Sequence, residues 1–168
     1  MQIITQNTII SPVAVERDLD SVLNIYQHCE DFLALGPVKV ASIEMVRADL
    51  RISCEEGGVF CGVYDRESGE MLAIVDFVVS GFHADPSLAF LSLLMIAAPH
   101  RGRGLGEEIV RAVEEEIRCS GKARAVESGV QVNNPRAIRF WQRMGYQIVS
   151  DPRDMGDGTT AYQLWKEL

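Results

Sequence analysis

The sequence predicts an α/β (α+β) fold in which helices flank a mixed central sheet. Two observations lead to this expectation. Strand-like and helix-like segments follow one another in the order β-α-α-β-β-β-α-β-α-β-β along the 168 residues. The strand-like segment at residues 88–97 is so apolar that both of its faces should be buried. No repeat, linker or low-complexity segment interrupts the chain, so we expect one domain spanning residues 1–168.

The N-terminal part predicts an edge strand followed by two helices. Residues 8–15 are rich in β-branched side chains but contain Pro12, which is typical of an edge strand. Asp18 is expected to cap the first helix, and Ser42 the second, which ends before Gly57. Apolar residues recur at helical spacing in both segments. They are Leu19, Val22, Leu23, Tyr26 and Leu33 in the first helix, and Ile43, Val46 and Leu50 in the second.

A hairpin and the apolar strand at 88–97 follow the two helices. Residues 59–64 and 71–79 are strand-like, and the short turn at 65–69 predicts that they pair antiparallel. Asp85 and Pro86 then break the chain before the strand at 88–97.

The C-terminal part alternates helices and strands. An amphipathic helix is expected at 104–120, with one apolar stripe and a row of glutamates facing water, and Gly121 ends it. The glutamates are Glu107, Glu108, Glu114 and Glu115. A strand at 123–132 and a short helix at 135–144 precede two terminal strands at 146–150 and 160–165. Together these segments make about seven strands and about four helices.

Composition and charge narrow the classes of function. Sixteen Lys and Arg against 24 Asp and Glu give a net charge of -8, which argues against a nucleic-acid partner because such binding needs basic surface. The acidic balance suits a cationic small-molecule partner, although solubility alone explains the same charge. The four cysteines form no C-x-x-C pair, so we expect no metal site and free thiols of a reducing compartment.

The chain carries no targeting or membrane signal. Its N-terminus lacks the basic start and apolar stretch of a signal peptide. The longest apolar run, at 93–99, is far shorter than the roughly 20 residues of a membrane span. We therefore expect a cytoplasmic protein without a membrane partner.

The most informative segment is the glycine turn between the strand at 88–97 and the following helix. It reads Arg101-Gly102-Arg103-Gly104-Leu105-Gly106. Glycines allow close approach of the backbone, and a helix N-terminus next to arginines attracts phosphate. A Walker loop would need Gly-Lys-Ser/Thr, and a dinucleotide fingerprint would need a third glycine where Glu107 or Ile109 stands. The turn instead reads Arg-x-x-Gly-x-Gly, which predicts a phosphate or diphosphate site, the alternative being a plain turn with solvated arginines.

This turn and a second segment resemble the GNAT superfamily of acyl-CoA N-acyltransferases. The family's cofactor motif is Arg/Gln-x-x-Gly-x-Gly/Ala between a strand and a helix. Residues 134–146, Asn-Pro-Arg-Ala-Ile-Arg-Phe-Trp-Gln-Arg-Met-Gly-Tyr, are similar to the family's Asn-x-x-Ala-x-x-Phe-Tyr-x-x-x-Gly-Phe signature. The order of elements matches over nearly the whole chain. The resemblance implies a GNAT-like sheet and an N-acetyltransferase that uses acetyl-CoA as co-substrate and no metal.

The resemblance also implies roles for particular residues. The backbone at 94–98 would pair with the pantetheine arm of acetyl-CoA, and residues 101–106 would hold the diphosphate through main-chain N–H groups. Asn134 would contact the cofactor, and Phe140 and Trp141 match an aromatic pair near its thiol, although core packing is the simpler interpretation of Phe140. The candidate cofactor residues are therefore Leu94, Ile96, Ala98, Arg101, Gly102, Arg103, Gly104, Leu105, Gly106, Asn134 and Trp141.

Trp141 departs from the family pattern. Many members carry Tyr there, whose hydroxyl is thought to protonate the departing thiolate, whereas an indole N–H cannot do so. A thiol with a pKa of about 8.5 needs little help to leave as thiolate near neutral pH. The resemblance implies direct attack of a neutral amine on the thioester, with a backbone N–H near Ile96 as the oxyanion donor.

No sequence motif identifies the general base. Asp76 interrupts an apolar strand, and Glu127 is placed similarly on a later strand, so both are candidate bases. A paired charge or a solvated strand edge is the more ordinary interpretation of each. Ser92 occupies the position where some relatives carry an acidic residue, which favours a water relay or a base elsewhere. His83 and His100 are expected to be structural or exposed.

Three functions remain open on these grounds. The first is acetyl transfer to a primary amine of a small molecule or a protein, with acceptor contacts expected around residues 29–40 and 81–86. The alternative is an acyl-CoA-binding regulatory protein without turnover, which the loss of Tyr at Trp141 keeps open. The third is a phosphate or nucleotide binder that shares only the glycine turn. Dimers are common among relatives, so a homodimer is a further expectation.

Overall fold

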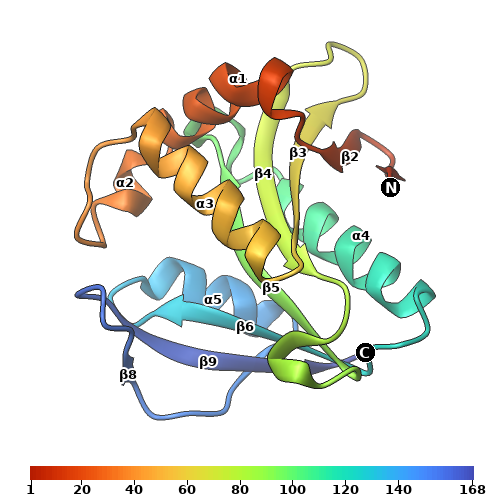
Figure 1. Ribbon diagram of the computed structural model, residues 1–168, viewed down its shortest axis with the longest axis vertical. Coiled ribbons are helices and arrows are strands. Elements are labelled where there is room, and N and C mark those ends of the chain that lie inside the picture. The colour runs from red at the N-terminus through yellow and green to blue at the C-terminus, as the bar shows by residue number, and fades with distance from the viewer.

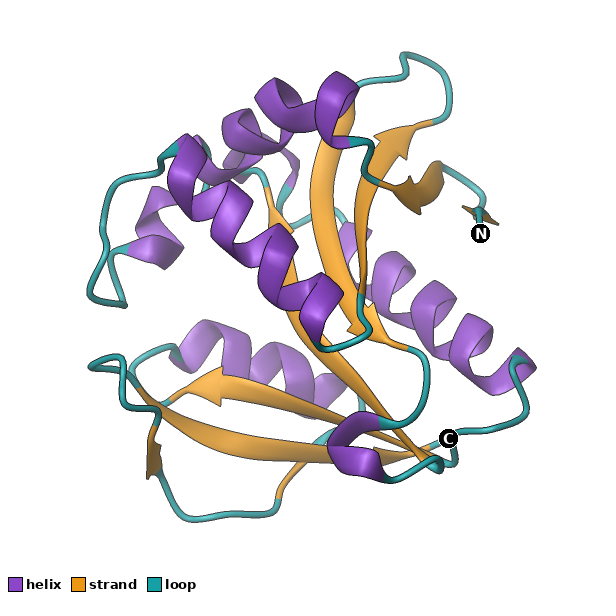
Figure 2. Cartoon of the chain, viewed as in Figure 1, coloured by secondary structure: helices purple, strands orange, loops and turns teal.

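The computed structural model describes residues 1–168 and contains one nine-stranded sheet with helices on both faces (Figures 1 and 2). The strand order is β1-β2-β3-β4-β5-β6-β9-β7, and β8 pairs with β9. Every neighbouring pair is antiparallel except β5 and β6, which are parallel. The mixed α/β sheet is confirmed, with more strands and helices than expected. None of the helices is long and apolar enough to cross a bilayer.

The elements have the following bounds. The strands are β1 (Ile3–Ile4), β2 (Thr8–Pro12), β3 (Val59–Asp65), β4 (Met71–Val78), β5 (Leu88–Ile96), β6 (Ala125–Gln131), β7 (Gln147–Ile148), β8 (Arg153–Asp154) and β9 (Thr160–Glu167). The α-helices are α1 (Val15–Gln27), α2 (Glu30–Leu33), α3 (Ile43–Glu55), α4 (Leu105–Cys119) and α5 (Pro135–Arg143). Two short 3-10 helices, η1 (Phe82–Ala84) and η2 (Ala98–His100), flank β5.

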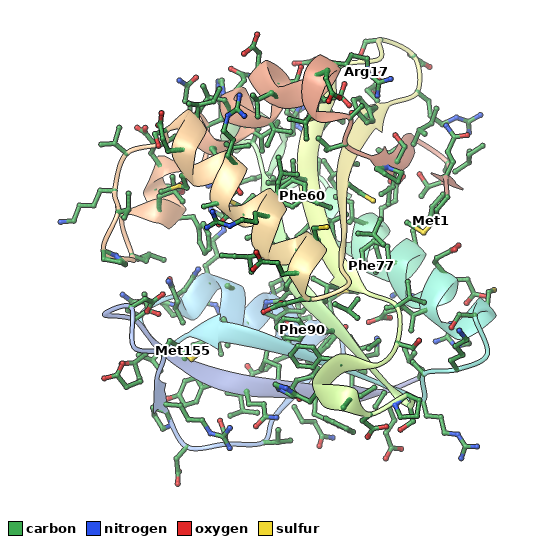
Figure 3. The ribbon with its side chains drawn as sticks, in the orientation of Figure 1. Met1, Arg17, Phe60, Phe77, Phe90 and Met155 are labelled. Carbon is green, nitrogen blue, oxygen red and sulfur yellow. The ribbon has the colours of Figure 1, made fainter.

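The two faces of the sheet carry separate hydrophobic clusters. Residues of α1 and α3 pack on one face, in a cluster that includes Phe60 of β3. Residues of α4 and α5 pack on the other face, in a cluster that includes Phe77 of β4 (both labelled in Figure 3). Both faces of the central strands are therefore covered, as the apolar character of residues 88–97 predicted.

The N-terminal strand differs from the expectation. The predicted strand at 8–15 is only β2, and it does not form the edge, because β1 pairs with it antiparallel from outside. A turn closed by the Thr5 N–H and the Thr8 carbonyl oxygen, 2.9 Å apart, brings β1 back along β2. The two-residue strand β1 was too short to be visible as a pattern in the sequence.

The helical region after it was also predicted only in part. Asp18 is not the cap of α1, since the helix begins at Val15 and the Asp18 carboxylate accepts the Ala14 N–H from inside the first turn. The predicted helix also stops earlier, and the chain restarts as the separate short helix α2 after Cys29. Ser42 caps α3 as predicted, because its Oγ accepts the Met45 N–H at 3.2 Å.

Two of the four glutamates predicted to face water on α4 are instead bonded to neighbouring strands. Glu108 accepts hydrogen bonds from Thr5, Asn7 and Thr8, which holds the N-terminal strands against α4. Glu114 is buried, and both of its oxygens lie 2.7 Å from the Lys166 ammonium on β9. Helical spacing alone could not show that the neighbouring strands bring bonding partners to these positions.

The divergence of β5 and β6 positions the functional site. The two strands pair only from Leu88–Ala125 to Leu91–Ser128 and then separate, as Figure 1 shows. The separation begins at a bulge in β5, where Asp76 of β4 is in register with Leu93 and Phe77 with Leu91, so Ser92 is the extra residue. Beyond this point one edge of β5 has no neighbouring strand.

The buried ion pair predicts the response to a substitution at Lys166. Lys166→Ala should lower the free energy of unfolding by about 3–5 kcal/mol, because it leaves the Glu114 carboxylate buried without a cation. Urea denaturation of the variant measures this loss. The double variant Glu114→Leu/Lys166→Met is the control and should recover most of it. A loss below about 1 kcal/mol in the single variant would show that water replaces the ammonium.

Candidate active site

A cavity of about 1040 Å³ lies where β5 and β6 separate. Its walls come from β5, β6, the N-terminal end of α4, the length of α5, helix α2 and the loop before β9. A cavity of this size and mixed polarity suits a large organic ligand. Residues of both motif segments, 101–106 and 134–146, therefore line the same cavity.

The unpaired edge of β5 presents backbone groups to this cavity. The Ala97 N–H donates to the Leu72 carbonyl oxygen at 3.1 Å, so in an antiparallel pair the N–H groups of Leu94 and Ile96 point away from β4. The Ile96 carbonyl oxygen accepts Nε of Arg101 at 2.7 Å and Sγ of Cys29 at 3.2 Å. The Ile96 N–H and both backbone groups of Leu94 remain, and they match an extended ligand that carries amides.

The glycine turn delivers free N–H groups to the other end of the cavity. Gly102 and Gly104 have φ of 76° and 83°, a left-handed conformation that favours glycine. Gly104 precedes α4 without any side-chain cap, and no carbonyl or side chain accepts the N–H groups of residues 102–107. Unpaired N–H groups at the positive end of a helix dipole form an anion site.

Gly106 lets α4 approach β5 and α5 closely. A Cβ there would lie 3.1 Å from Cδ1 of Ile96 and 3.2 Å from the ring of Phe140. A larger residue would therefore force the Ile96 or Phe140 side chain to shift by a few tenths of an ångström. The last glycine of the motif is therefore explained by packing, and it places the free N–H groups beside the open edge of β5.

Asn134 and Trp141 have structural contacts besides lining the cavity. Asn134 caps α5, because its Oδ1 accepts the Ala137 N–H at 3.0 Å, which leaves its amide NH2 free to donate. Trp141 is buried and packs edge-on against Phe140 and Tyr146. Phe140 belongs to the same packed group, as its simpler interpretation predicted.

Arg101 braces the site instead of presenting its charge to it. Its guanidinium pairs with both oxygens of Asp31, at 2.5 and 3.0 Å, and the hydrogen bond lowers the pKa of that carboxyl. Since its Nε also bonds the Ile96 carbonyl oxygen, Arg101 ties α2 to the end of β5. The pKa of the nearby Cys29 thiol is raised by burial and partly lowered again by Arg101, so Cys29 is a thiol and no ready nucleophile.

Of the two candidate bases, only Asp76 is connected to the cavity. Its carboxylate is buried and accepts Oγ of Ser53 and Oγ of Ser92, each at 2.6 Å. Ser92 is exposed and lines the cavity, whereas neither Asp76 nor Glu127 does. The hydroxyl of Ser92 therefore stands between the cavity and a carboxylate on the neighbouring strand. Glu127 is also buried, on β6, and makes no hydrogen bond with Ser92, whose hydroxyl bonds Asp76.

The structure brings most of the predicted cofactor residues together. Leu94, Ile96, Arg101, Gly104, Gly106, Asn134 and Trp141 line the cavity. Ala98 does not, and its N–H donates to the His28 carbonyl oxygen at 3.2 Å. Gly102, Arg103 and Leu105 are not part of the lining either, although their N–H groups are free.

Several lining residues were not found from the sequence. Three arginines of α5, Arg136, Arg139 and Arg143, line the cavity without an ion-pair partner. Their spacing of three and four residues places them on one helix face, which was a usable signal. Phe32 and Leu35 lie in the segment expected to hold the acceptor, but Met155 and Asp157 of the loop before β9 had no sequence signal. The segment at 81–86, also expected to contact the acceptor, does not line the cavity.

No group of three or more His, Cys, Asp or Glu side chains lies close enough together to hold a metal ion. The cavity lining offers a ligand backbone groups, hydroxyls, amides and guanidinium groups, and it also contains the carboxylates of Asp31, Glu107 and Asp157.

Comparison with known proteins agrees with this architecture. Residues 19–146 match the profile of the acetyltransferase (GNAT) family. Blasticidin-S acetyltransferase of Streptomyces morookaense is 34% identical over 82 residues, which are 46% of this chain and 56% of that protein. The matched region thus spans little more than half of that relative.

Solved structures share the fold over the whole chain. An acetyltransferase from Thermus thermophilus superimposes with a TM-score of 0.78 at 24% identity, covering 100% of both chains. A Salmonella typhimurium acetyl transferase that modifies the N-terminal serine of ribosomal protein L7/L12 gives a TM-score of 0.79 at 12% identity, covering 100% of this chain and 99% of that one. At these identities the likeness concerns the fold.

The family match covers both motif segments, and the structure joins them around one cavity with the open strand edge and the free helix end that the resemblance implied. The chain belongs to the acetyltransferase (GNAT) family.

Proposed function

We propose that this protein transfers the acetyl group of acetyl-CoA to a primary amine. One observation carries the proposal: the unpaired edge of β5 and the uncapped N-terminus of α4 open into the same cavity. The first suits the amides of the pantetheine arm, and the second suits the diphosphate. Family membership supports the same cofactor and reaction.

The charges around the cavity support an anionic cofactor despite a net charge of -8. The diphosphate would accept N–H groups of residues 102–107, with Arg103 nearby. Arg136, Arg139 and Arg143 of α5 would add positive charge on the same side, because no carboxylate pairs with them. Asn134 would donate its free amide NH2.

The thioester would lie beside Ile96. Its N–H points into the cavity and would donate to the carbonyl oxygen as negative charge develops there. Attack by the amine nitrogen forms the C–N bond and breaks the C–S bond, and the thiolate of CoA leaves. Trp141 cannot supply a proton, and a thiol with a pKa of about 8.5 can leave as thiolate.

The proton of the amine would pass to Asp76 through Ser92. The amine nitrogen would approach Oγ of Ser92, whose own proton is directed at the Asp76 carboxylate 2.6 Å away. Ser53 holds the other carboxylate oxygen at 2.6 Å and so orients it. This connection also favours turnover over the alternative of a regulatory protein that only binds acyl-CoA, since binding requires no proton acceptor.

The acceptor would be a small-molecule amine. The blasticidin-S enzyme supports a small molecule, whereas the Salmonella relative modifies a protein terminus. The net charge of -8 favours a cationic small molecule over a protein. The homodimer stays a prediction.

The cofactor site can be tested at Gly104. Gly104→Glu should weaken acetyl-CoA binding about 100-fold or more, because a carboxylate there repels the diphosphate and blocks the N–H groups. Titration calorimetry measures the affinity. Gly121→Glu is the matched control, since Gly121 lies at the other end of α4, also with positive φ and with open space around its Cβ position. Equal affinities in the two variants would refute the assignment.

The proton path can be tested at Ser92 and Asp76. Ser92→Ala should lower kcat about 100-fold, in the range of general base catalysis, and Asp76→Asn should lower it comparably. The double variant should be no slower than either single variant, because the two groups act in series. Ser68→Ala, in the exposed turn between β3 and β4, is the control and should keep kcat. A Ser92→Ala enzyme within threefold of the unsubstituted protein would exclude this path.

The reaction itself is tested by following free thiol with a panel of amines after acetyl-CoA has been titrated. We expect acetyl-CoA to bind and free thiol to be released only when an amine is present. Binding without release for any small-molecule or peptide amine would instead establish the regulatory alternative, and no binding would refute both.

A further inference from the structure

One face of β6 presents two hydrogen-bond acceptors without donors, on either side of an open position. Side chains alternate along a strand, so Glu127, Gly129 and Gln131 share this face. The Glu127 side chain is 8% exposed and makes no hydrogen bond or ion pair. Oε1 of Gln131 is buried and also has no donor. Gly129 between them is exposed, and a Cβ there would meet nothing within 4 Å.

This hollow adjoins the place of acetyl transfer. Leu91 and Ser128 are the last paired residues of β5 and β6, so Ser92 and Gly129 are the next residue of each strand. Glu127 is in register with Phe90, labelled on β5 in Figure 3. Ser92 lies two residues after Phe90, which places the Cα atoms of Glu127 and Ser92 roughly 8 Å apart from ordinary strand spacings.

The side chains involved point to the same side of the sheet. Phe90 is in register with Val78, which shares its face of β4 with Asp76, and Ser92 bonds Asp76 on that side. Phe60 of β3 is paired with Asp76 and packs in the cluster with α1 and α3. This side of the sheet is therefore the one that α3 covers. The hollow and the Ser92 hydroxyl therefore lie on the same side of the sheet, beside the gap between β5 and β6.

No protein cation reaches the Glu127 carboxylate. Arg101 is turned toward Asp31, and the three cavity-lining arginines belong to α5, which packs on the opposite face of the sheet. Asp76 already accepts two serine hydroxyls, so it offers no donor. The residue is mostly buried, and a largely desolvated carboxylate is stabilised when a cation pairs with it.

We infer that the hollow at Gly129 binds a second cationic group of the acceptor, with Glu127 as its counter-ion and Gln131 as an additional acceptor. The acceptor class is then a small dication that carries one amine at Ser92 and a second ammonium or guanidinium group at Glu127. This inference rests on the proposed acetyl transfer and names the substrate class of that same site. It makes Glu127 a specificity residue and not the proton acceptor.

The kinetic test compares diaminoalkanes with monoaminoalkanes of the same chain length. The unsubstituted enzyme should prefer the diamine in kcat/KM. Glu127→Gln should reduce that preference about 10- to 100-fold, the range for one charged hydrogen bond, mainly through KM. Glu167→Gln on the neighbouring strand β9 is the matched control and should keep the preference. An unchanged preference in Glu127→Gln would overturn the inference.

A binding test does not depend on turnover. With CoA present, a diamine should raise the Tm of the unsubstituted protein more than the matched monoamine does, and Glu127→Gln should lose this difference. The variant should fold, because it only neutralises a buried charge without a partner. Equal Tm shifts for both amines in the unsubstituted protein would overturn the inference. If acetyl-CoA binds but no amine is acetylated, the proposed function fails, and this Tm comparison still decides whether the dication site exists.

Discussion

The separation of β5 from β6 is the constraint on which the rest of the structure depends. A strand in the middle of a sheet normally uses the hydrogen-bonding groups of both edges, and leaving buried backbone groups unpaired is unfavourable. Here the extra residue Ser92 bends β5 away after the Leu91–Ser128 pair. The open edge of β5 faces the cavity, so its unpaired groups can bond to water or to a ligand with extended amide character.

The surrounding elements keep this edge open and aligned. Arg101 and the Cys29 thiol bind the Ile96 carbonyl oxygen, and the Asp31–Arg101 pair fastens α2 to the same place. On the other side, Nδ2 of Asn133 donates to the Leu35 carbonyl oxygen at 3.1 Å. The segment around α2 is thus attached to the ends of both diverging strands. The sequence motif suggested that the charge of Arg101 would bind the ligand. In the structure this charge instead pairs with Asp31 and holds two walls of the cavity together.

The two faces of the sheet carry chemical groups that suit different ligands. On the face of α4 and α5 lie the free helix end and the unpaired arginines, which suit a phosphorylated cofactor. On the face of α3 lie Asp76 with its two serines, and Glu127 beside the hollow at Gly129. Positive and negative potentials therefore meet across the gap between β5 and β6, where an anionic acyl donor and a cationic acceptor would react.

The sequence by itself determined the class of fold, the family and the two helix starts at the proposed cofactor end of the site. These depend on local features: hydrophobic periodicity sets the strands and helices, and glycines at 102–106 with Asn134 before Pro135 shape two helix starts. The tertiary structure decided the rest, because it depends on residues far apart in the chain. It turned Arg101 toward Asp31, buried Glu114 against Lys166, and joined Asp76 to Ser92 through a bulge that no local pattern shows. The role of a charged residue follows from its partner, and only the folded chain brings the partner.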